Sequence, residues 1–225
     1  MPEREDRAVE VHLIADLACP WCHIGLARLN RARAERPDVS VKVRWWPFML
    51  NPHLPADGMD RAAYVRLKFG GEAAASQIYE RIREAGRQDG IEFAFERMTR
   101  TPSTLAAHRL ILHAQEKGRG EPLMLALFKA LFERGEDIGQ RDRLIEASAA
   151  AGLDAAEAAA FLDGRERAAD VIAAHQRAEQ IGVRGVPVFV VGGRHAISGA
   201  QPPEILTGLL DLAGAAATEG QAASP

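Results

Sequence analysis

The pattern of apolar and polar positions divides the first part of the chain into strand, helix and strand. Val9 to Ala15 (VEVHLIA) alternates and then becomes apolar, which is typical of a strand. Val39 to Trp46 (VSVKVRWW) alternates strictly and predicts a second strand. Between them, in Cys22 to Glu35, apolar residues and arginines recur at the spacing of an amphipathic helix. Pro37 marks the end of this helix. The order predicts a β-α-β unit.

A different pattern fills the middle of the chain, where strand signal is almost absent. A proline-rich loop, Pro47 to Gly58, leads into this region. Asp154, with Glu157 three residues later, is a candidate helix N-cap with a capping-box partner. Helical periodicity and breaker residues predict helices over Asp60–Phe69, Glu72–Asp89, Ser103–Lys117, Pro122–Glu133, Arg141–Ala151, Ala155–Leu162 and Arg165–Ile181.

Strand signal returns near the C-terminal end. Val186 to Val191 and His195 to Ser198 flank a Gly192-Gly193 turn, and this combination predicts a β-hairpin. A last helix should open at Pro202-Pro203 and run to about Leu212. The small and polar residues 215–225 are expected to form a disordered tail.

Strands at both ends of the chain must pair with one another to form a stable sheet. Each half-motif holds only about 45 residues, too few to bury a core alone. We therefore expect an α/β fold with one mixed sheet and a helical insertion. Residues 1–56 and 166–214 would form a discontinuous domain, and residues 57–165 would form the inserted helical domain.

Charge and hydropathy narrow the possible partners. A net charge of −3 over 225 residues argues against a nucleic-acid surface. The sequence has no long apolar run that could span a membrane and no apolar stretch typical of a signal peptide. We therefore expect no membrane partner and a cytoplasmic location, where structural disulfides are rare and a CxxC pair more often serves redox or metal chemistry.

The two cysteines of the chain, Cys19 and Cys22, lie where the first strand gives way to the first helix. If Cys19 caps the helix, the free backbone N–H groups and the helix dipole favour its thiolate. Pro20 then occupies the first helical position, which suits a residue without an N–H. Cys22 lies one turn further in, so we expect Cys19 to attack a disulfide and Cys22 to resolve the mixed disulfide. Trp21 would offer an apolar surface beside the sulfur atoms.

A CxxC pair can also be half of a zinc site, which needs further histidine or carboxylate ligands. His108 and His113 are five residues apart and fall on different faces of a helix, so they make poor partners. We predict no metal site. His23 could alter the thiolate population in either direction. Pro187 stands at the mouth of a strand that should be central, a position where proline must begin the strand or sit in an unusual peptide.

The chain resembles the DsbA-like thioredoxin-fold oxidoreductases, and within them the FrnE-like cytosolic branch. The resemblance extends over most of the chain in the family's order. It is carried by Asp16 to Cys22 with Gly25, Trp46-Pro47-Phe48 with Leu50-Asn51-Pro52, Thr104 to Arg109, Gly182 to Phe189, and Gly199 to Pro202.

The resemblance implies a thioredoxin-like fold with a large all-helical insertion and thiol–disulfide exchange on protein or small-molecule disulfides. It also implies a cis peptide bond before Pro187 and a backbone at Val186 that binds an extended substrate by strand addition. No tightly bound cofactor is expected, although glutathione could serve as the thiol partner.

Four further residues are candidates for supporting roles. Asp16 could exchange protons with Cys22, although such an aspartate often only caps a turn. His108 could line the cleft or be a packed histidine, and Asn51 is a candidate by resemblance alone. Arg184 could attract a carboxylate of glutathione or remain a solvated side chain.

Two functional alternatives stay open beside the dithiol oxidoreductase. The first is a glutathione-dependent enzyme of the 2-hydroxychromene-2-carboxylate isomerase or kappa-class transferase type. Those relatives resemble this chain in fold but typically carry serine at the position of Cys19, and they need no resolving thiol such as Cys22. The second is a non-catalytic metal or partner module, for which the sequence offers no second ligand set.

Overall fold

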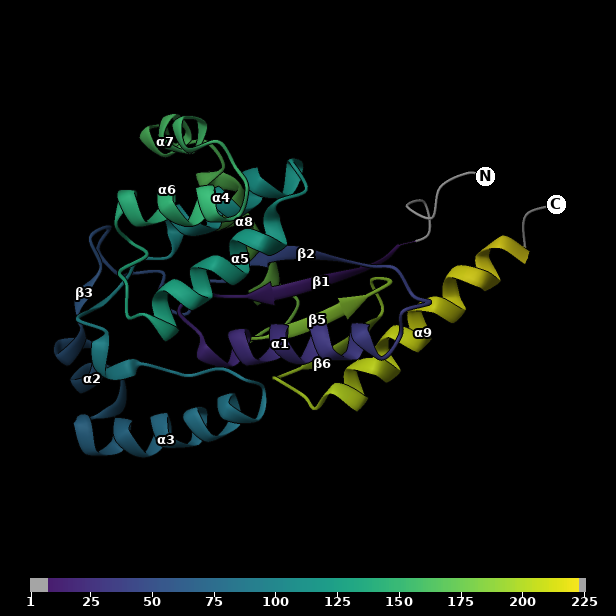
Figure 1. Ribbon diagram of the computed structural model, residues 1–225, viewed down its shortest axis with the longest axis horizontal. Coiled ribbons are helices and arrows are strands. Elements are labelled where there is room, and N and C mark those ends of the chain that lie inside the picture. Colours follow the sequence, from purple (N-terminus) through teal and green to yellow (C-terminus); the bar gives the residue numbers. More distant parts are fainter. Residues whose placement is uncertain (1–7, 223–225) are drawn as a thin grey trace.

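Four strands form one mixed sheet in the computed structural model, which describes the backbone of residues 8–222 and the side chains of residues 8–213. The sheet order is β2-β1-β5-β6 (Figure 1). The β1–β2 pair is parallel, and the β1–β5 and β5–β6 pairs are antiparallel. The expected mixed sheet, built from both ends of the chain, is confirmed. Its strands are β1 Val9–Ala15, β2 Val41–Pro47, β5 Val188–Val191 and β6 His195–Ser198.

Helices cover the sheet and fill the stretch between β2 and β5. Apart from the C-terminal end of the last helix, they match the periodicity of the sequence within one or two turns at each end. They are α1 Pro20–Ala34, α2 Arg61–Phe69, α3 Glu72–Gln88, α4 Leu105–Glu116, α5 Gly120–Phe128, α6 Arg141–Ala150, α7 Ala155–Asp163, α8 Ala168–Gln180 and α9 Pro203–Ala222. Asp154 caps α7 as expected, because its side chain accepts a hydrogen bond from the Glu157 N–H.

Three local features of the inserted region were not predicted, and the smallest is a single 3-10 turn at Phe95–Arg97. A short antiparallel ladder joins β3 (Met59–Asp60) to β4 (Arg100–Thr101). A π-helical turn, Lys129–Glu133, continues α5 and changes the direction in which its last side chains point. The helical region interrupts the sheet in the chain, as expected. The limits of the two expected domains stay a prediction. These are residues 1–56 with 166–214 for the discontinuous domain and residues 57–165 for the inserted one.

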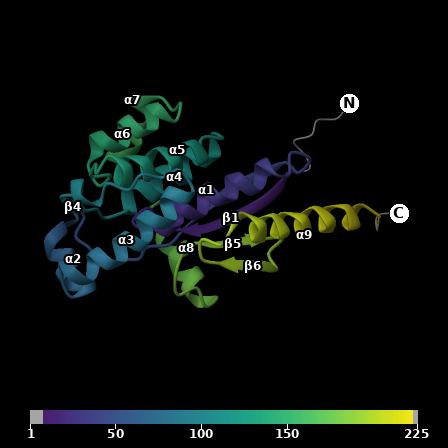
Figure 2. The ribbon, with the colours of Figure 1, turned by 60° about the horizontal axis from the view of Figure 1, so that its bottom comes forward.

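The two faces of the sheet bury different side chains, because neighbours along a strand point to opposite sides. Val11 and Leu13 of β1 are fully buried on the face covered by α1 and α9, which run side by side in Figure 2. Ile14 packs on the opposite face in a cluster that includes Ala178 of α8. Burial on both faces explains why the last residues of β1 are all apolar.

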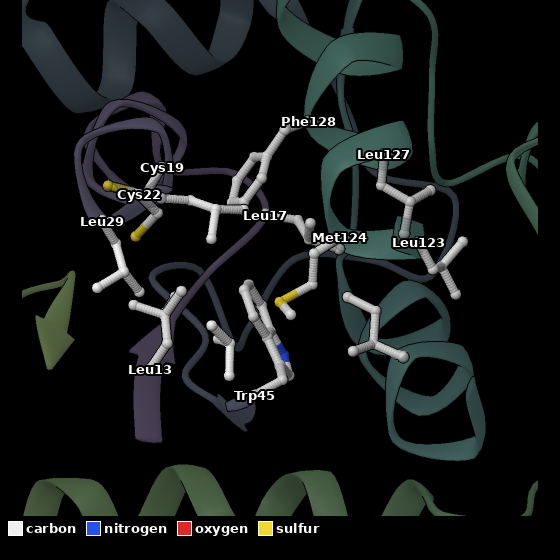
Figure 3. Packing of buried hydrophobic residues seen from close by; sticks show 14 of the residues in the cluster. Leu13, Leu17, Cys19, Cys22, Leu29, Trp45, Leu123, Met124, Leu127 and Phe128 are labelled. Atoms are coloured by element: carbon white, nitrogen blue, oxygen red, sulfur yellow. The ribbon is translucent and has the colours of Figure 1, made fainter. Parts of the chain in front are cut away.

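The adjacent tryptophans of β2 divide between these two faces. Trp45 is 3% exposed and belongs to a core that continues from the sheet into α5, where Met124 and Phe128 pack beside it (Figure 3). The indole N–H of Trp46 donates to the Ala174 carbonyl of α8. The inserted helices are thereby packed onto the sheet by a shared core.

Helix α9 is longer than the sequence pattern predicted. It reaches Ala222, and its C-terminal part extends beyond the sheet (Figures 1 and 2). The expected disorder of 215–225 is therefore wrong for 215–222, while 223–225 lie outside the described residues. Alanine, the strongest helix former, is frequent in this segment, and the next proline is Pro225. Among residues 8–222, no helix combines the length and apolar content needed to cross a membrane.

Candidate active site

Cys19 and Cys22 lie at the junction of β1 and α1, as the sequence predicted. Cys19 is the N-cap of α1, with an extended backbone and no capping bond from its side chain. Pro20 is the first residue of the helix, where its missing N–H costs no hydrogen bond. The Cys22 N–H donates to the Cys19 carbonyl at 3.0 Å, which closes the first turn. The Cys19 side chain therefore lies beside the free N–H groups of a helix N-terminus.

The two thiols differ in access. Cys19 is 5% exposed, whereas Cys22 is fully buried, and both are free thiols (Figure 3). Burial raises the pKa of the Cys22 thiol well above its ordinary value, and the neighbouring Cys19 sulfur raises it further. Cys19 is thus the sulfur that a substrate can reach, and Cys22 is held protonated behind it.

The loop before β5 forms the second half of the site. The Val186–Pro187 peptide bond is cis, and the Cys19 thiol donates to the Val186 carbonyl at 3.5 Å. Gly25 of α1 permits this approach. A Cβ atom there would lie 3.0 Å from Pro187 Cγ and 3.1 Å from Phe189 Cζ. The absence of a side chain at position 25 lets the helix rest directly on the loop.

Asp16 lies beneath the thiols and is 1% exposed. Its Oδ1 accepts hydrogen bonds from the Ala18 N–H at 3.2 Å and from His108 Nε2 at 3.2 Å. Its Oδ2 accepts from the Leu50 N–H at 2.7 Å. Three donors thus fix the orientation of one carboxylate, whose charge acts on the Cys22 thiol.

His108 is fully buried and has a defined tautomer. The Trp45 indole N–H donates a hydrogen bond to His108 Nδ1 at 2.9 Å, so Nδ1 carries the lone pair. The proton of the ring is therefore on Nε2, which donates the hydrogen bond to Asp16. Helix α4 of the inserted region therefore supplies a residue to the site. His108 is both a packed histidine and part of the network that holds Asp16.

His23 joins α1 to the inserted region from the other side. It is 2% exposed, stacks on Phe128 at 5.2 Å between ring centroids, and contacts Glu133 Oε1 through Nε2 at 2.9 Å. The hydrogen bond from His23 lowers the pKa of the Glu133 carboxyl. Within the described side chains, His23 Nδ1 has no hydrogen-bond partner.

A cavity of about 220 Å³ opens beside Cys19, between the first turn of α1 and the inserted helices α2 and α3. Trp21, 37% exposed, lines it together with Pro20. The remaining lining is mainly apolar and aromatic, with two cationic side chains. It comprises Ala18, Leu50, Arg61, Tyr64, Lys68, Phe69, Ile78, Tyr79, Ile82, Phe95, Met98, Thr101, Pro102, Leu131 and Phe132.

Comparison with known protein families identifies the chain. The family model described as a DSBA-like thioredoxin domain matches residues 10–211. The protein belongs to this DsbA-like family. The expected fold and the resemblance to DsbA-like oxidoreductases are thereby confirmed, and the finer FrnE-like assignment stays a prediction.

Similar proteins cover most of the chain. A probable DsbA oxidoreductase from Streptomyces coelicolor is 32% identical, with a TM-score of 0.78 over 91% of this chain and 89% of that one. An uncharacterised protein of Bacillus subtilis is 25% identical over 82% of this chain and 87% of its own length. The cytosolic disulfide reductase DsbM of Pseudomonas aeruginosa, solved with GSH, is 20% identical, with a TM-score of 0.63 over 91% of this chain and 98% of that one. This last likeness shows the fold alone.

The structure places the other expected residues of this DsbA-like protein at the margin of the site. The Asn51 side chain accepts a hydrogen bond from the Tyr64 hydroxyl at 3.4 Å. Arg184 is exposed and donates to the Glu179 and Val183 carbonyls at the end of α8. Neither side chain lines the cavity beside Cys19.

Sequence reasoning missed the residues that shape the cavity, above all Arg61, Tyr64 and Tyr79. They come from helices far along the chain, and single aromatic or arginine residues in an amphipathic helix carry no signal of their own. Within the described residues, no group of three or more histidine, cysteine, aspartate or glutamate side chains could hold a metal ion.

Proposed function

We propose that the protein is a thiol–disulfide oxidoreductase in which Cys19 attacks and Cys22 resolves. The observation that supports it most is the difference between the two thiols. Cys19 caps α1, contacts the Val186 carbonyl and lines the cavity beside α1, whereas Cys22 is fully buried one turn behind it. A glutathione-dependent enzyme of the isomerase or kappa-class transferase type would have no use for this second thiol.

The exchange takes place in two balanced steps. The Cys19 thiolate attacks one sulfur of a disulfide R–S–S–R′, forms the mixed disulfide Cys19–S–S–R and expels R′–S⁻. Cys22 then loses its proton, attacks the Cys19 sulfur, closes the Cys19–Cys22 disulfide and expels R–S⁻. The substrate gains two electrons and two protons, and the dithiol of the protein loses them.

Asp16 accepts the proton of Cys22 in the second step. A buried thiol with a raised pKa cannot ionise unless a nearby group takes the proton, and the charge of Asp16 acts on this thiol. The substrate would lie along the Val186–Pro187 loop by strand addition and against Pro20 and Trp21. His23, Asn51, His108 and Arg184 would support the site without contacting the reacting sulfurs.

The direction of exchange follows from the compartment. We place the protein in the cytoplasm, where the reducing poise would hold a mildly oxidising pair as the dithiol. It would therefore act as a reductase or isomerase on protein or small-molecule disulfides, and glutathione or a similar thiol would restore the dithiol. The similarity in fold to a cytosolic disulfide reductase solved with GSH supports this proposal.

Insulin reduction with thiol counting tests the proposal. The wild type should catalyse the reduction of insulin and lose two thiols when it is oxidised. Cys19→Ser should abolish the catalysis and the loss of thiols. Cys22→Ser should stop turnover and leave a mixed disulfide on Cys19. Activity that survives Cys22→Ser and depends on added glutathione would support the isomerase or transferase alternative instead.

A further inference from the structure

Arg61 occupies an unusual position at the wall of the cavity beside Cys19. It is the first residue of α2, and its guanidinium donates to the Thr101 hydroxyl at 3.0 Å and to the Tyr79 hydroxyl at 2.6 Å. The same guanidinium lies over the rings of Tyr64 and Tyr79, 5.5 and 5.4 Å from their centroids. Hydrogen bonds and stacking on two tyrosines therefore fix the direction of this cation.

This cation has no anionic partner in the described part of the chain. Arg61 is half-buried, yet no carboxylate there lies within 4.0 Å of its nitrogen atoms, whereas Arg28 and Arg33 of α1 each pair with a carboxylate. Burial raises the pKa of Tyr64 and of Tyr79, so both phenols stay neutral and supply no counter-charge. Charges removed from water are normally paired.

A second cation lines the same cavity as Arg61. Lys68 also lines the cavity, is exposed, and has no ion pair with a described carboxylate. No aspartate or glutamate is among the lining residues. A cavity with two unpaired cations and no acid attracts an anion.

The size and the walls of the cavity define the rest of the ligand. Its volume of about 220 Å³ exceeds the roughly 150 Å³ that holds one benzene ring in a protein core. The space therefore suits one aromatic ring with a small substituent. Aromatic walls favour such a planar guest through stacked and edge contacts. The aromatic residues that line it are Trp21, Tyr64, Phe69, Tyr79, Phe95 and Phe132.

We propose that this cavity binds the aromatic, carboxylate-bearing half of a small disulfide, with Arg61 holding the carboxylate and the ring lying against the aromatic walls. The inference rests on the proposed function, because it places the bound sulfur beside Cys19. Cys19 attacks that sulfur and expels the other half as a thiolate, and Cys22 then releases the aromatic thiolate. Two molecules of a low-molecular-weight thiol such as glutathione then return the two electrons to the Cys19–Cys22 disulfide and leave as their own disulfide.

Binding can be tested without any redox step. In the Cys19→Ser/Cys22→Ser chain, calorimetric titration compares 4-(methylthio)benzoate with the uncharged 4-(methylthio)benzamide. A charge-assisted hydrogen bond contributes about 1.5–3 kcal/mol, so the carboxylate should bind roughly 10- to 100-fold more tightly. Equal affinity for the two compounds overturns the proposal, whatever the variants show.

Substitutions identify the residue that holds the carboxylate. Arg61→Gln should remove most of the preference for benzoate while benzamide still binds, a pattern that general damage to the cavity would not produce. Arg66→Gln is the matched control, because Arg66 is an exposed arginine on the same helix that does not line the cavity. A benzoate preference that survives Arg61→Gln, or that Arg66→Gln also removes, overturns the assignment to Arg61.

A kinetic comparison connects the site to the reaction. The rate at which a disulfide oxidises the protein thiols is measured for bis(4-carboxyphenyl) disulfide, bis(4-carbamoylphenyl) disulfide and glutathione disulfide. Each rate is divided by the rate at which the same disulfide oxidises dithiothreitol, which corrects for its intrinsic reactivity. The carboxyphenyl compound should give the highest ratio, and equal ratios overturn the proposed selectivity. If benzoate binds but no disulfide oxidises the thiols, the proposed function fails and the anion site stands.

Discussion

The Cys19 thiol donates to the Val186 carbonyl at 3.5 Å, although the two residues are 167 positions apart in the chain. The antiparallel pairing of β1 with β5 produces this contact, because it brings the end of β1 to the start of β5. The inserted helices occupy the chain between these strands and return to the same place, where α4 contributes His108. The site therefore depends on three regions of the sequence folding together.

Thiol access gives the first prediction. Because 5% of the Cys19 surface is exposed and Cys22 is fully buried, iodoacetamide should alkylate Cys19 much faster than Cys22 in the folded protein. Peptide mass spectrometry after brief labelling should find carbamidomethyl groups at Cys19, and denatured protein should carry them at both positions. Labelling of Cys22 at a similar rate in the folded state would contradict the assigned roles.

Gly25→Ala should destabilise the protein. The added methyl would meet Pro187 and the fully buried Phe189 at about 3 Å, closer than an ordinary van der Waals contact. Overpacking of this kind costs about 1–3 kcal/mol, which outweighs the gain of up to about 1 kcal/mol from replacing glycine in a helix. Urea unfolding measures the difference.

Gly208→Ala is the matched control for that experiment. Gly208 lies in α9, and a Cβ atom there would meet nothing within 4 Å. The substitution should therefore stabilise the protein by about 0.5–1 kcal/mol through helix propensity alone. If both variants are more stable than the wild type, the conclusion that α1 packs closely on the Pro187 loop is contradicted.

Local signals explain which parts of the fold could be predicted from sequence. Three such signals are the alternation in β1 and β2, the Gly192-Gly193 turn and the cap at Asp154. Each of them is contained within a few consecutive residues. The order of these elements then limited the topology to one mixed sheet with an insertion. The C-terminal part of α9 escaped prediction because its small residues are compatible with both a helix and a disordered tail.

The environment of the cysteines was less predictable, because its contacts join distant segments. The CxxC motif and Pro187 identified the reacting sulfurs and the adjoining loop. Nothing in the sequence indicated that Glu133 would contact His23, since the π-helical turn after α5 decides where Glu133 points. Likewise, the unpaired charge of Arg61 is a property of the folded cavity and has no signature in the sequence around it.

Asp16→Asn should slow the second step of exchange more than the first. An amide cannot take the proton of Cys22, so the mixed disulfide formed with hydroxyethyl disulfide should accumulate on Cys19 and be visible by intact mass. Stability should fall as well. The amide NH₂ would face backbone N–H or His108 donors, and each unsatisfied buried group costs about 1–3 kcal/mol.

Asp89→Asn separates the effect on proton transfer from the effect on stability. The Asp89 side chain is only 1% exposed and binds Arg28 and Arg31, away from the thiols. Its substitution should also destabilise the protein, yet the mixed disulfide should be resolved at the wild-type rate. Accumulation in both variants would mean that Asp16 acts only through folding.

The pair of His23 and Glu133 gives a stability difference that depends on pH. The hydrogen bond from His23 lowers the folded-state pKa of Glu133 below its ordinary value of 4.5. The ionised carboxylate therefore stabilises the folded state at neutral pH, and this contribution is lost as the pH falls through the folded-state pKa. Glu133→Gln removes the charge but keeps an oxygen that can accept from His23.

We expect Glu133→Gln to lower stability at neutral pH by less than about 1 kcal/mol, because the side chain of Glu133 is still 27% exposed. The difference from wild type should shrink once the carboxyl is protonated. Urea unfolding midpoints of both proteins at a series of pH values between neutral and acid measure it. Glu92→Gln, at an exposed carboxylate without a described ion pair, should show no such trend. If the difference in stability between wild type and Glu133→Gln were the same at all pH values, Glu133 would stabilise the protein through packing and not through its charge.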